Sequence, residues 1–368
     1  MRRCLELAQL AIGHVAPNPV VGAVLVSGGR IIGEGYHRQY GQAHAEVNCL
    51  RSVQADDIPL IQQSTMYVSL EPCAHHGKTP PCADLIIEKK IPRVVVGCRD
   101  PFPEVNGKGI EKLQAAGAVV ELGILEKECK ALNRRFFTFH TLHRPYILLK
   151  WAQSANGRIA AEGGVSRART LISNEYTNRL VHKWRSQEAA ILVGTNTALL
   201  DDPALTVRLW SGPDPIRLVI DKDLRLPSSL QLFNGQARTI VFNLVRHDMG
   251  AGNEPWMVGG DKKLAGNEGG KAGNVLYYQL ATDSSLVHQI IQALNQLTIQ
   301  SVMIEGGAEL LQSFIDEGYW DEARVITNDE LQIRDGLAGP SLPEAAVLWS
   351  KEGLFTDTIR YYTNPLFP

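Results

Sequence analysis

Hydrophobic and polar positions alternate along the first part of the chain in two different periods. Apolar residues that recur every three to four positions predict helices, and short apolar or alternating runs between turn residues predict strands. These patterns predict helices at 2–12, 45–53, 81–89, 107–116 and 125–139 and strands at 20–26, 30–36, 65–70, 93–98 and 118–122. The strands at 20–26 and 30–36, separated by Ser27-Gly28-Gly29, are expected to pair as a hairpin. Strands that alternate with helices indicate a layered α/β sheet.

A second alternation of the same kind begins near residue 146, after His143-Arg144-Pro145. We therefore expect one domain at 1–143 and another at 144–368. In the second, the patterns predict helices at 284–296 and 308–317 and strands at 146–151, 190–193, 216–220, 239–242, 275–279 and 301–304. The stretch 246–274 is rich in Gly, Asn and Lys and lacks periodicity, which predicts a surface loop.

Composition narrows the class of protein without changing this picture. A chain of 368 residues favours two domains, and 44% hydrophobic and 21% charged residues are ordinary for a globular protein. A net charge of −2 argues against a nucleic-acid partner, which usually demands a basic face. No apolar run approaches the length that spans a bilayer, about 20 residues. The first residues lack the apolar core of a signal peptide, so we expect a cytoplasmic protein with no membrane partner.

Six cysteines in a chain of this length do not indicate a disulfide framework. Four of them lie in apolar-periodic segments, where a free cysteine is usually a small buried hydrophobic residue: Cys4, Cys49, Cys98 and Cys129. The other two belong to a different pattern.

The segments His44-Ala45-Glu46, Glu71-Pro72-Cys73 and Pro81-Cys82 together indicate a zinc site. Three protein ligands, His44, Cys73 and Cys82, leave the fourth tetrahedral position open for water, as in catalytic zinc sites. His44 and Cys82 are expected at helix N-termini, whose partial positive charge favours thiolates. Glu46 is expected to carry protons from the attacking water to a ring nitrogen and to the leaving ammonia, as in zinc-dependent nucleobase deaminases.

Three alternatives remain open on these residues alone. The zinc could be structural, in a binding module whose Glu46 is exposed. The chain could be a cytidine or tRNA-adenosine deaminase with a degenerate second domain, although a basic surface or shorter cysteine spacing would then be expected. It could also be a single-activity nucleobase or nucleoside deaminase with a non-catalytic second domain.

Eight residues separate Cys73 from Cys82, where nucleobase deaminases usually have two. With Pro17-Asn18-Pro19-Val20-Val21-Gly22-Ala23, this spacing resembles the deaminase domain of the bifunctional deaminase/reductase family of riboflavin biosynthesis. Residues 150–158, 194–208 and 304–308 resemble its reductase domain. The resemblance implies a cytidine-deaminase-like three-layer domain followed by a dihydrofolate-reductase-like domain. It also implies hydrolytic deamination of a diamino-ribosylaminopyrimidinone phosphate, then reduction of its ribosyl group to ribityl with NADPH.

The resemblance also implies site residues. In the deaminase domain it places four at the substrate: Asn18, His37, His75 and Lys78. An Asn amide can pair with a pyrimidine edge and a Lys can meet a phosphate or a sugar. For His37 and His75, the sequence alone favours ordinary surface or loop histidines. Asp100 could orient the substrate, but an Asp before a Pro is also a common turn former.

In the second domain the resemblance places Ser166, Arg185, Leu205, Arg208 and Glu305 at the substrate, and Ala152, Ala168, Thr197, Asp201, Lys222, Gly306 and Gly307 at the cofactor. The two arginines are candidate phosphate clamps, with solvated surface charges as the alternative. A strand that runs into Gly306-Gly307 and then a helix can bring backbone N–H groups to an anion. Either Lys150 or Asp201 could assist proton transfer.

Two departures from the family pattern lie in this domain. Residues 167–173 contain no Trp, where the family commonly has one at the cofactor, and Asn156 stands where Asp is common. The ligands implied for the whole chain are Zn²⁺, NADPH and a small phosphorylated pyrimidine. We also expect a homo-oligomer, either a dimer or a tetramer.

Overall fold

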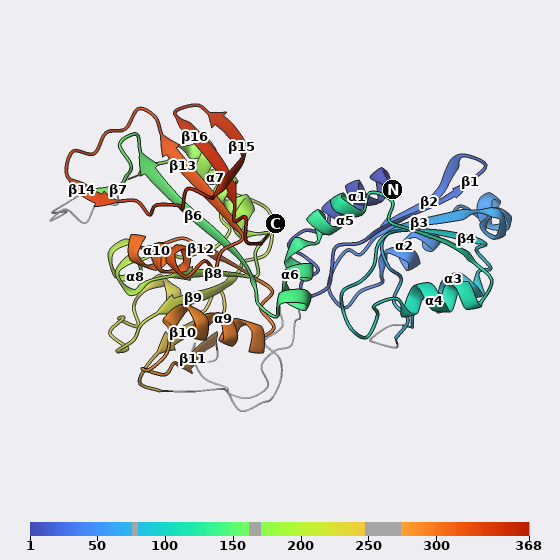
Figure 1. Cartoon of the computed structure of the whole chain (residues 1–368), viewed down its shortest axis with the longest axis horizontal. Helices are drawn as coiled ribbons and strands as arrows, with labels where there is room; N and C mark the ends of the chain where they lie inside the picture. Colours follow the sequence, from blue (N-terminus) through green and yellow to red (C-terminus); the bar gives the residue numbers. More distant parts are fainter. Residues whose placement is uncertain (76–79, 162–170, 247–273, 368) are drawn as a thin grey trace. The chain divides into compact units, whose positions relative to one another are not determined.

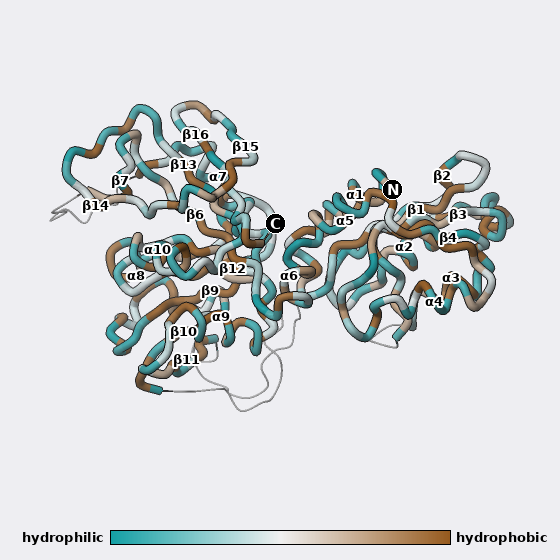
Figure 2. The backbone as a smooth tube through the Cα atoms, in the orientation of Figure 1, coloured by the Kyte–Doolittle hydropathy of each residue, from teal (hydrophilic) through white to brown (hydrophobic). Residues whose placement is uncertain are grey.

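The structure is a computed structural model, and it describes residues 1–75, 80–161, 171–246 and 274–367. The described residues form two compact units, one up to His143 and one from Arg144 onward (Figure 1). In both units the hydrophobic residues gather in the central strands (Figure 2). The loop expected at 246–274 lies almost entirely outside the described residues. Among those described, no helix is long and apolar enough to cross a bilayer.

The first unit is built on a five-stranded mixed sheet. Its strands lie in the order β2-β1-β3-β4-β5. Strand β1 (Gly22–Ser27) pairs antiparallel with both β2 (Arg30–Tyr36) and β3 (Thr65–Leu70), which confirms the predicted hairpin. Strands β3, β4 (Arg93–Cys98) and β5 (Val119–Leu122) run parallel.

Helices cover both faces of this sheet and give three layers. One face packs against α2 (Ala45–Arg51), α3 (Cys82–Glu88), α4 (Lys108–Ala115) and the short 3-10 helix η1 (Ala55–Gln63). The other packs against α1 (Arg2–Gln9) and α5 (Glu126–Leu132), and α6 (Arg134–Leu142) follows α5. The four cysteines expected in the core, Cys4, Cys49, Cys98 and Cys129, are all buried, as predicted.

Helix α2 lies unusually close to β2, which fixes the start of the helix. Gly35 permits this approach, because a Cβ atom there would lie 2.3 Å from the backbone N of Cys49. A Cβ atom at Gly33 would likewise lie 2.7 Å from the Cys49 carbonyl oxygen. No larger residue fits at either position without moving α2 and His44 with it.

The second unit is built on a nine-stranded sheet in the order β11-β10-β9-β8-β12-β6-β13-β16-β15. Most neighbouring strands of this sheet run parallel. They are, in order across the sheet, β11 (Val275–Gln279), β10 (Thr239–Asn243), β9 (Ile216–Ile220), β8 (Ala190–Val193), β12 (Ser301–Ile304), β6 (Tyr146–Ser154) and β13 (Glu322–Asn328). β16 (Asp357–Thr363) and β15 (Val347–Leu354) complete one edge antiparallel. A separate small sheet pairs β7 (Arg158–Ala161) with β14 (Gly336–Ala338).

Two cores lie on the two faces of this large sheet. One packs the strands against α9 (Leu286–Gln296) and α10 (Ala308–Asp316). The other packs them against α7 (Glu175–Arg185), α8 (Thr195–Asp201) and the short η2 (Gln231–Phe233). A largely parallel sheet with an antiparallel edge and helices on both faces is the dihydrofolate-reductase-like arrangement expected for this half of the chain.

Several expected elements differ from the structure. The helix expected at 125–139 is wrong: it is two helices, α5 and α6, broken at Asn133. The Asn133 side chain accepts a hydrogen bond from the Val20 amide and donates one to the Val20 carbonyl, both at 2.8–2.9 Å. This pairing ties the break to the start of the first sheet. The first helix ends at Gln9 rather than residue 12, and Pro81 precedes the first turn of α3 instead of lying in it.

Candidate metal centre and reductase site

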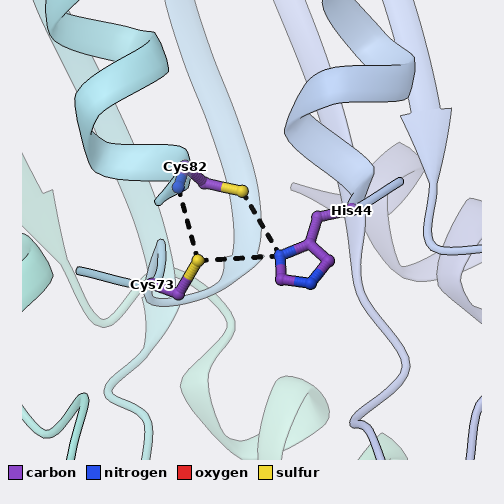
Figure 3. A group of neighbouring side chains, drawn as sticks. All are labelled: His44, Cys73 and Cys82. Atoms are coloured by element: carbon purple, nitrogen blue, oxygen red, sulfur yellow. Dashed lines mark hydrogen bonds between the residues drawn. The ribbon is translucent and has the colours of Figure 1, made fainter. Parts of the chain in front are cut away.

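Three metal-ligand side chains converge at one end of the first sheet. His44 immediately precedes α2, Cys73 follows β3, and Cys82 opens α3 (Figure 3). The Nδ1 atom of His44 lies 3.6 Å from Sγ of Cys73 and 3.4 Å from Sγ of Cys82, and all three donor atoms lie within 4.8 Å of one another. Tetrahedral zinc, with Zn–S of about 2.3 Å and Zn–N of about 2.0 Å, places such donors about 3.6 Å apart. The three residues therefore fit a zinc ion.

The backbone around the two cysteines favours a thiolate. The Cys82 amide donates to Sγ of Cys73 at 3.3 Å, and the Ala83 amide donates to the Cys73 carbonyl at 3.1 Å. The hydrogen bond between the two thiols lowers the pKa of Cys73 to about 4, and the same bond raises the pKa of Cys82. These hydrogen bonds favour the thiolate form of Cys73, which metal binding requires.

Glu46 lies in the first turn of α2 with its side chain buried, at 3% exposure. Burial raises the pKa of Glu46, and the negative charge of Cys73 raises it further. A Zn²⁺ ion held by the three donors would supply a Lewis acid that acidifies a water in the fourth position, and its charge would oppose this shift. A buried carboxyl group with a raised pKa is suited to take a proton and give it back.

Asn18 and His37, both implied as substrate residues, form one hydrogen-bonded pair. Nε2 of His37 lies 3.0 Å from Nδ2 of Asn18, and Nδ1 of His37 lies 3.1 Å from the Ala43 carbonyl oxygen. The ring therefore donates from Nδ1 and accepts at Nε2, which fixes the neutral form, and burial lowers the pKa of His37. His37 is buried at 3% exposure, so the surface-histidine alternative is wrong. It packs edge-on against His44 at 5.3 Å between ring centroids.

His75 lies beside the metal ligands, in contact with an aromatic group. Its ring centroid lies 6.2 Å from that of Phe102, which in turn lies 5.1 Å from His140 of α6. Nδ1 of His75 is buried with no hydrogen-bond partner among the described residues. Such an atom is expected to meet a ligand or water. Lys78 lies outside the described residues.

Asp100 is also buried near the thiols. Burial raises the pKa of Asp100 to about 7, while its hydrogen bond from the Phe102 amide, at 2.8 Å, lowers it. The turn and substrate interpretations are therefore compatible, because one carboxylate oxygen shapes the turn.

Glu71 is a residue of this region that sequence analysis missed. Its carboxylate accepts four backbone hydrogen bonds of 3.0–3.3 Å, from Asp100, Gly107, Gly109 and Ile110. It therefore holds the 100–110 segment and the start of α4 against the loop that carries Cys73. The sequence shows only an acidic residue directly after a strand. Its partners lie 29 to 39 residues further along the chain, and no spacing rule links them.

In the second unit the implied residues gather at the carboxyl ends of parallel strands. Lys150 and Ala152 lie on β6, Thr197 and Asp201 on α8 after β8, Lys222 after β9, and Glu305, Gly306 and Gly307 after β12. The register brings these strand ends together, because Ile304 of β12 pairs with both Leu149 and Leu192. Ligands of open parallel sheets bind at this edge. Ser166 and Ala168 lie outside the described residues, as does most of the 167–173 segment.

Arg185 and Glu305 form a buried ion pair at this edge. Nε and Nη2 of Arg185 donate to the two oxygens of Glu305 at 2.9 and 2.5 Å, with both side chains less than 10% exposed. Burial alone would raise the pKa of Glu305, but the charges of Arg185 and Lys150 outweigh it and hold the pKa near 2. Arg185 is thus not a solvated surface charge.

The segment that carries Leu205 and Arg208 lies beside this ion pair. Leu205 is buried in the core with a φ of 50°, a left-handed conformation that is costly for a leucine. Nη1 of Arg185 reaches the Thr206 carbonyl at 3.4 Å, and the Arg208 side chain is exposed. Nη1 of the exposed Arg208 donates to the Thr206 hydroxyl at 3.3 Å, so hydrogen bonds hold a loop whose backbone is strained at Leu205.

The implied cofactor residues include one close contact. A Cβ atom at Gly306 would lie 2.8 Å from the Thr197 side chain, and Gly307 has a φ of 71° directly before α10. Both backbone positions favour glycine, and Gly307 leads directly into the N-terminus of α10, a kind of helix end that can bind an anion. Asp201 and Lys222 are exposed. The variant residue Asn156 binds the Ile333 backbone through both its side-chain oxygen and nitrogen, which is a structural role.

Comparisons with known proteins agree with both halves of the chain. Residues 1–98 match the family described as cytidine and deoxycytidylate deaminase zinc-binding region, and residues 145–328 match the RibD C-terminal domain. The chain is 39% identical to the riboflavin biosynthesis protein RibD of Aquifex aeolicus, over 89% of this chain and 85% of that protein. It is 37% identical to the RibD protein of Actinobacillus pleuropneumoniae, over 86% of this chain and 80% of that one.

Solved structures give the same result. The crystal structure of a diaminohydroxyphosphoribosylaminopyrimidine deaminase/5-amino-6-(5-phosphoribosylamino)uracil reductase from Thermotoga maritima matches with a TM-score of 0.82 at 34% identity, covering 99% of this chain and 97% of that one. RibD of Acinetobacter baumannii matches with a TM-score of 0.83 at 31% identity, covering 98% and 97%.

The fold and the three-donor centre define a zinc-dependent deaminase joined to an NADPH-dependent reductase. The chain belongs to the RibD family of bifunctional riboflavin-biosynthesis enzymes, which act on a small phosphorylated pyrimidine. The alternatives of a zinc-stabilised binding module and of a deaminase with a non-catalytic second domain are not favoured.

Proposed function

We propose that residues 1–143 deaminate a diamino-ribosylaminopyrimidinone phosphate and that residues 144–368 reduce the ribosyl group of the product. The observation that carries the first assignment is the set of three donors at tetrahedral separations, with the buried Glu46 in the first turn of the helix that His44 precedes. Zinc sites with three protein ligands are catalytic sites.

In the first reaction, water adds to the ring carbon that bears the amino group, and ammonia leaves. We assign to Glu46 the removal of a proton from that water and its delivery to the adjacent ring nitrogen, and then a second transfer to the departing amine. Asn18, fixed by its hydrogen bond with His37, would pair with the pyrimidine edge. His75 would contact the substrate through its buried Nδ1, and Lys78 would meet the phosphate.

For the second reaction, bound NADPH would supply a hydride for the ribosyl carbon next to the amino nitrogen. The bond from that carbon to the sugar-ring oxygen opens, and the released oxygen takes a proton. Arg208 is the candidate for the phosphate, since its side chain is exposed and its backbone is held. The Arg185–Glu305 pair and Lys150 would border the ribosyl group, with Ser166 and Leu205. Of the two candidate proton donors, Lys150 is favoured over Asp201, because it lies near enough to lower the pKa of Glu305, whereas Asp201 is exposed.

The cofactor side of the reductase site would be formed by seven residues. Gly306, Gly307 and Thr197 would contact the pyrophosphate at the start of α10, and Ala152, Ala168, Asp201 and Lys222 would contact the rest of NADPH. The close approach of Thr197 to Gly306 supports this grouping.

The proposal also includes a homo-oligomer, supported by the edge strand β15. Three consecutive apolar residues there, Val347, Leu348 and Trp349, are 48–53% exposed. An exposed apolar edge strand offers unpaired backbone groups and apolar surface to which another chain can pair. A cytoplasmic location is supported by the reduced thiols that the metal site needs.

The test of the two assignments follows both reactions at once. The enzyme is supplied with the diamino substrate, Zn²⁺ and NADPH, while ammonia release and NADPH oxidation are recorded separately. Chelation of the metal should stop ammonia release, and oxidation should continue when the deaminated product is supplied instead. Loss of both activities on chelation, or ammonia release that survives it, would contradict the division of labour.

A further inference from the structure

The strained loop at 205–208 is held by two side chains of α7 that lie one helical turn apart. Arg185 donates from Nη1 to the Thr206 carbonyl at 3.4 Å. His182, three residues earlier, accepts a hydrogen bond at Nδ1 from the Arg208 amide at 3.0 Å. The Val207 amide between them is bound by Asp214 at 2.6 Å. His182 therefore holds the backbone of Arg208, while Nη1 of Arg208 itself donates to the Thr206 hydroxyl at 3.3 Å.

His182 is held in the one state that can make this contact. It is buried, at 2% exposure, and burial together with the charges of Arg185, Arg208 and Lys150 lowers its pKa to about 4. The ring is therefore neutral at physiological pH. Because Nδ1 accepts from an amide, the ring proton is on Nε2. A protonated ring would present an N–H to the Arg208 N–H and break the bond.

We propose that His182 is a positioning residue of the reductase site, which orients the 205–208 loop so that Arg208 meets the substrate phosphate. This inference rests on the proposed phosphate role of Arg208. Leu205 makes such a restraint necessary: its left-handed backbone is unfavourable for a leucine, and the loop would relax toward another conformation if its hydrogen bonds were lost. The buried Leu205 side chain anchors one end of the loop and His182 anchors the other.

The test uses the full-length enzyme with the deaminated phosphate substrate and NADPH. His182→Phe keeps the ring volume and removes the acceptor; His182→Asn keeps an acceptor near the position of Nδ1. Loss of one backbone hydrogen bond that positions a charge should raise the KM for substrate about tenfold in His182→Phe, with kcat within about twofold. His182→Asn should stay within about threefold of the parent enzyme. His288→Phe, on α9, is the matched control and should leave KM unchanged.

The phosphate dependence separates positioning from general damage. A substrate without the 5′-phosphate should show nearly the same KM with the parent enzyme and with His182→Phe. If His182→Phe does not fold, His182→Asn and His182→Gln replace it, because Gln carries its acceptor near Nε2 and should fail where Asn succeeds.

Three results would overturn the inference: an unchanged KM in folded His182→Phe, equal impairment of His182→Asn and His182→Phe, or equal loss with the phosphate-free substrate. Arg208→Gln distinguishes the positioning role of His182 from the phosphate-binding role of Arg208. If it raises KM and His182→Phe does not, only the positioning role fails. If it leaves KM unchanged, the phosphate assignment of Arg208 fails.

Discussion

The two units each bury a glutamate at the centre of a reaction site, and they treat its charge in opposite ways. Glu46 is surrounded by thiols and an imidazole, and burial raises its pKa. The Glu305 side chain is only 6% exposed, but Arg185 and Lys150 hold its pKa near 2. The first carboxyl group has its compensating charge supplied from outside, by a metal ion. The second has it built into the chain, as a salt bridge.

This difference separates a group that exchanges protons from a group that keeps its charge. A carboxyl group with a raised pKa can alternate between its two forms during a reaction. One with a pKa near 2 stays ionised, and it can orient a cation or a hydroxyl group but not shuttle a proton at neutral pH. The comparison predicts that substitutions at the two positions fail in different ways.

Glu46→Gln should have the largest effect. The amide keeps the size of the side chain and cannot carry a proton, so deamination should fall about a thousandfold. Metal analysis should still find zinc, and NADPH oxidation with the deaminated product should be unchanged. Glu88→Gln, on exposed α3 surface, is the control. If the variant deaminates at more than a tenth of the parent rate, Glu46 does not carry the protons in this reaction.

Glu305→Gln should damage stability as well as reduction. The substitution leaves Arg185 buried without its partner, which should lower the free energy of unfolding at pH 7 by about 3 kcal/mol. The rate of NADPH-dependent reduction should fall about a hundredfold. Deamination should be retained, and Glu309→Gln, exposed on α10, is the control.

The pH dependence of the free energy of unfolding tests whether Glu305 is charged in the folded protein. The folded pKa of Glu305 is about 2, below the value near 4.3 of an unfolded glutamate. Its contribution is therefore complete above about pH 4.3 and is lost as the pH falls toward about 2. Denaturant titrations should show that the difference between parent and Glu305→Gln shrinks over that window. A constant difference would contradict the charged state of Glu305.

Glu71→Gln should have a smaller and local effect. An amide presents its N–H₂ group to two of the four backbone donors, so we expect a loss of about 2–3 kcal/mol in the first unit. Deamination should fall about tenfold, since the 100–110 segment borders the metal centre, and reduction should be unaffected. Equal activity and equal Tm in parent and variant would show that the loop does not need this carboxylate.

Trp349→Ser should have the smallest effect on chemistry. Removing the last of the three exposed apolar residues at the start of β15 should shift the mass seen in light scattering toward the monomer, with both activities within about twofold. Leu10→Ser, which removes an exposed apolar residue in the first unit, is the control and should not change the mass. An unchanged mass would show that β15 does not form the interface between subunits.

Sequence patterns predicted the buried parallel strands well and the C-terminal strands not at all. Strands β3, β4, β8, β9, β11 and β12 have the predicted bounds, because short apolar runs between turn residues are the expected signal. β13 is equally buried but carries Glu322 and Arg324, which neutralise each other at 2.7 Å. That pairing is invisible in the sequence, and the strand was not predicted.

The same distinction holds for the sites. His44, Glu46, Cys73 and Cys82 are predictable because zinc chemistry demands particular residue types at helix starts. Glu71 and His182 act through hydrogen bonds to backbone amides from distant segments, which any residue type can provide. Nothing in the local pattern distinguishes such residues from ordinary charged or polar positions.

The two bonds that join Ala83 and Cys82 to Cys73 have a consequence for how this centre can vary. They close a ring whose ends are fixed at both metal ligands. The entropy of closing such a ring grows only logarithmically, by about 0.6 kcal/mol for each doubling of its length. Insertions between the two cysteines are therefore tolerated cheaply, and the number of intervening residues can diverge between deaminases while the donor geometry is inherited intact.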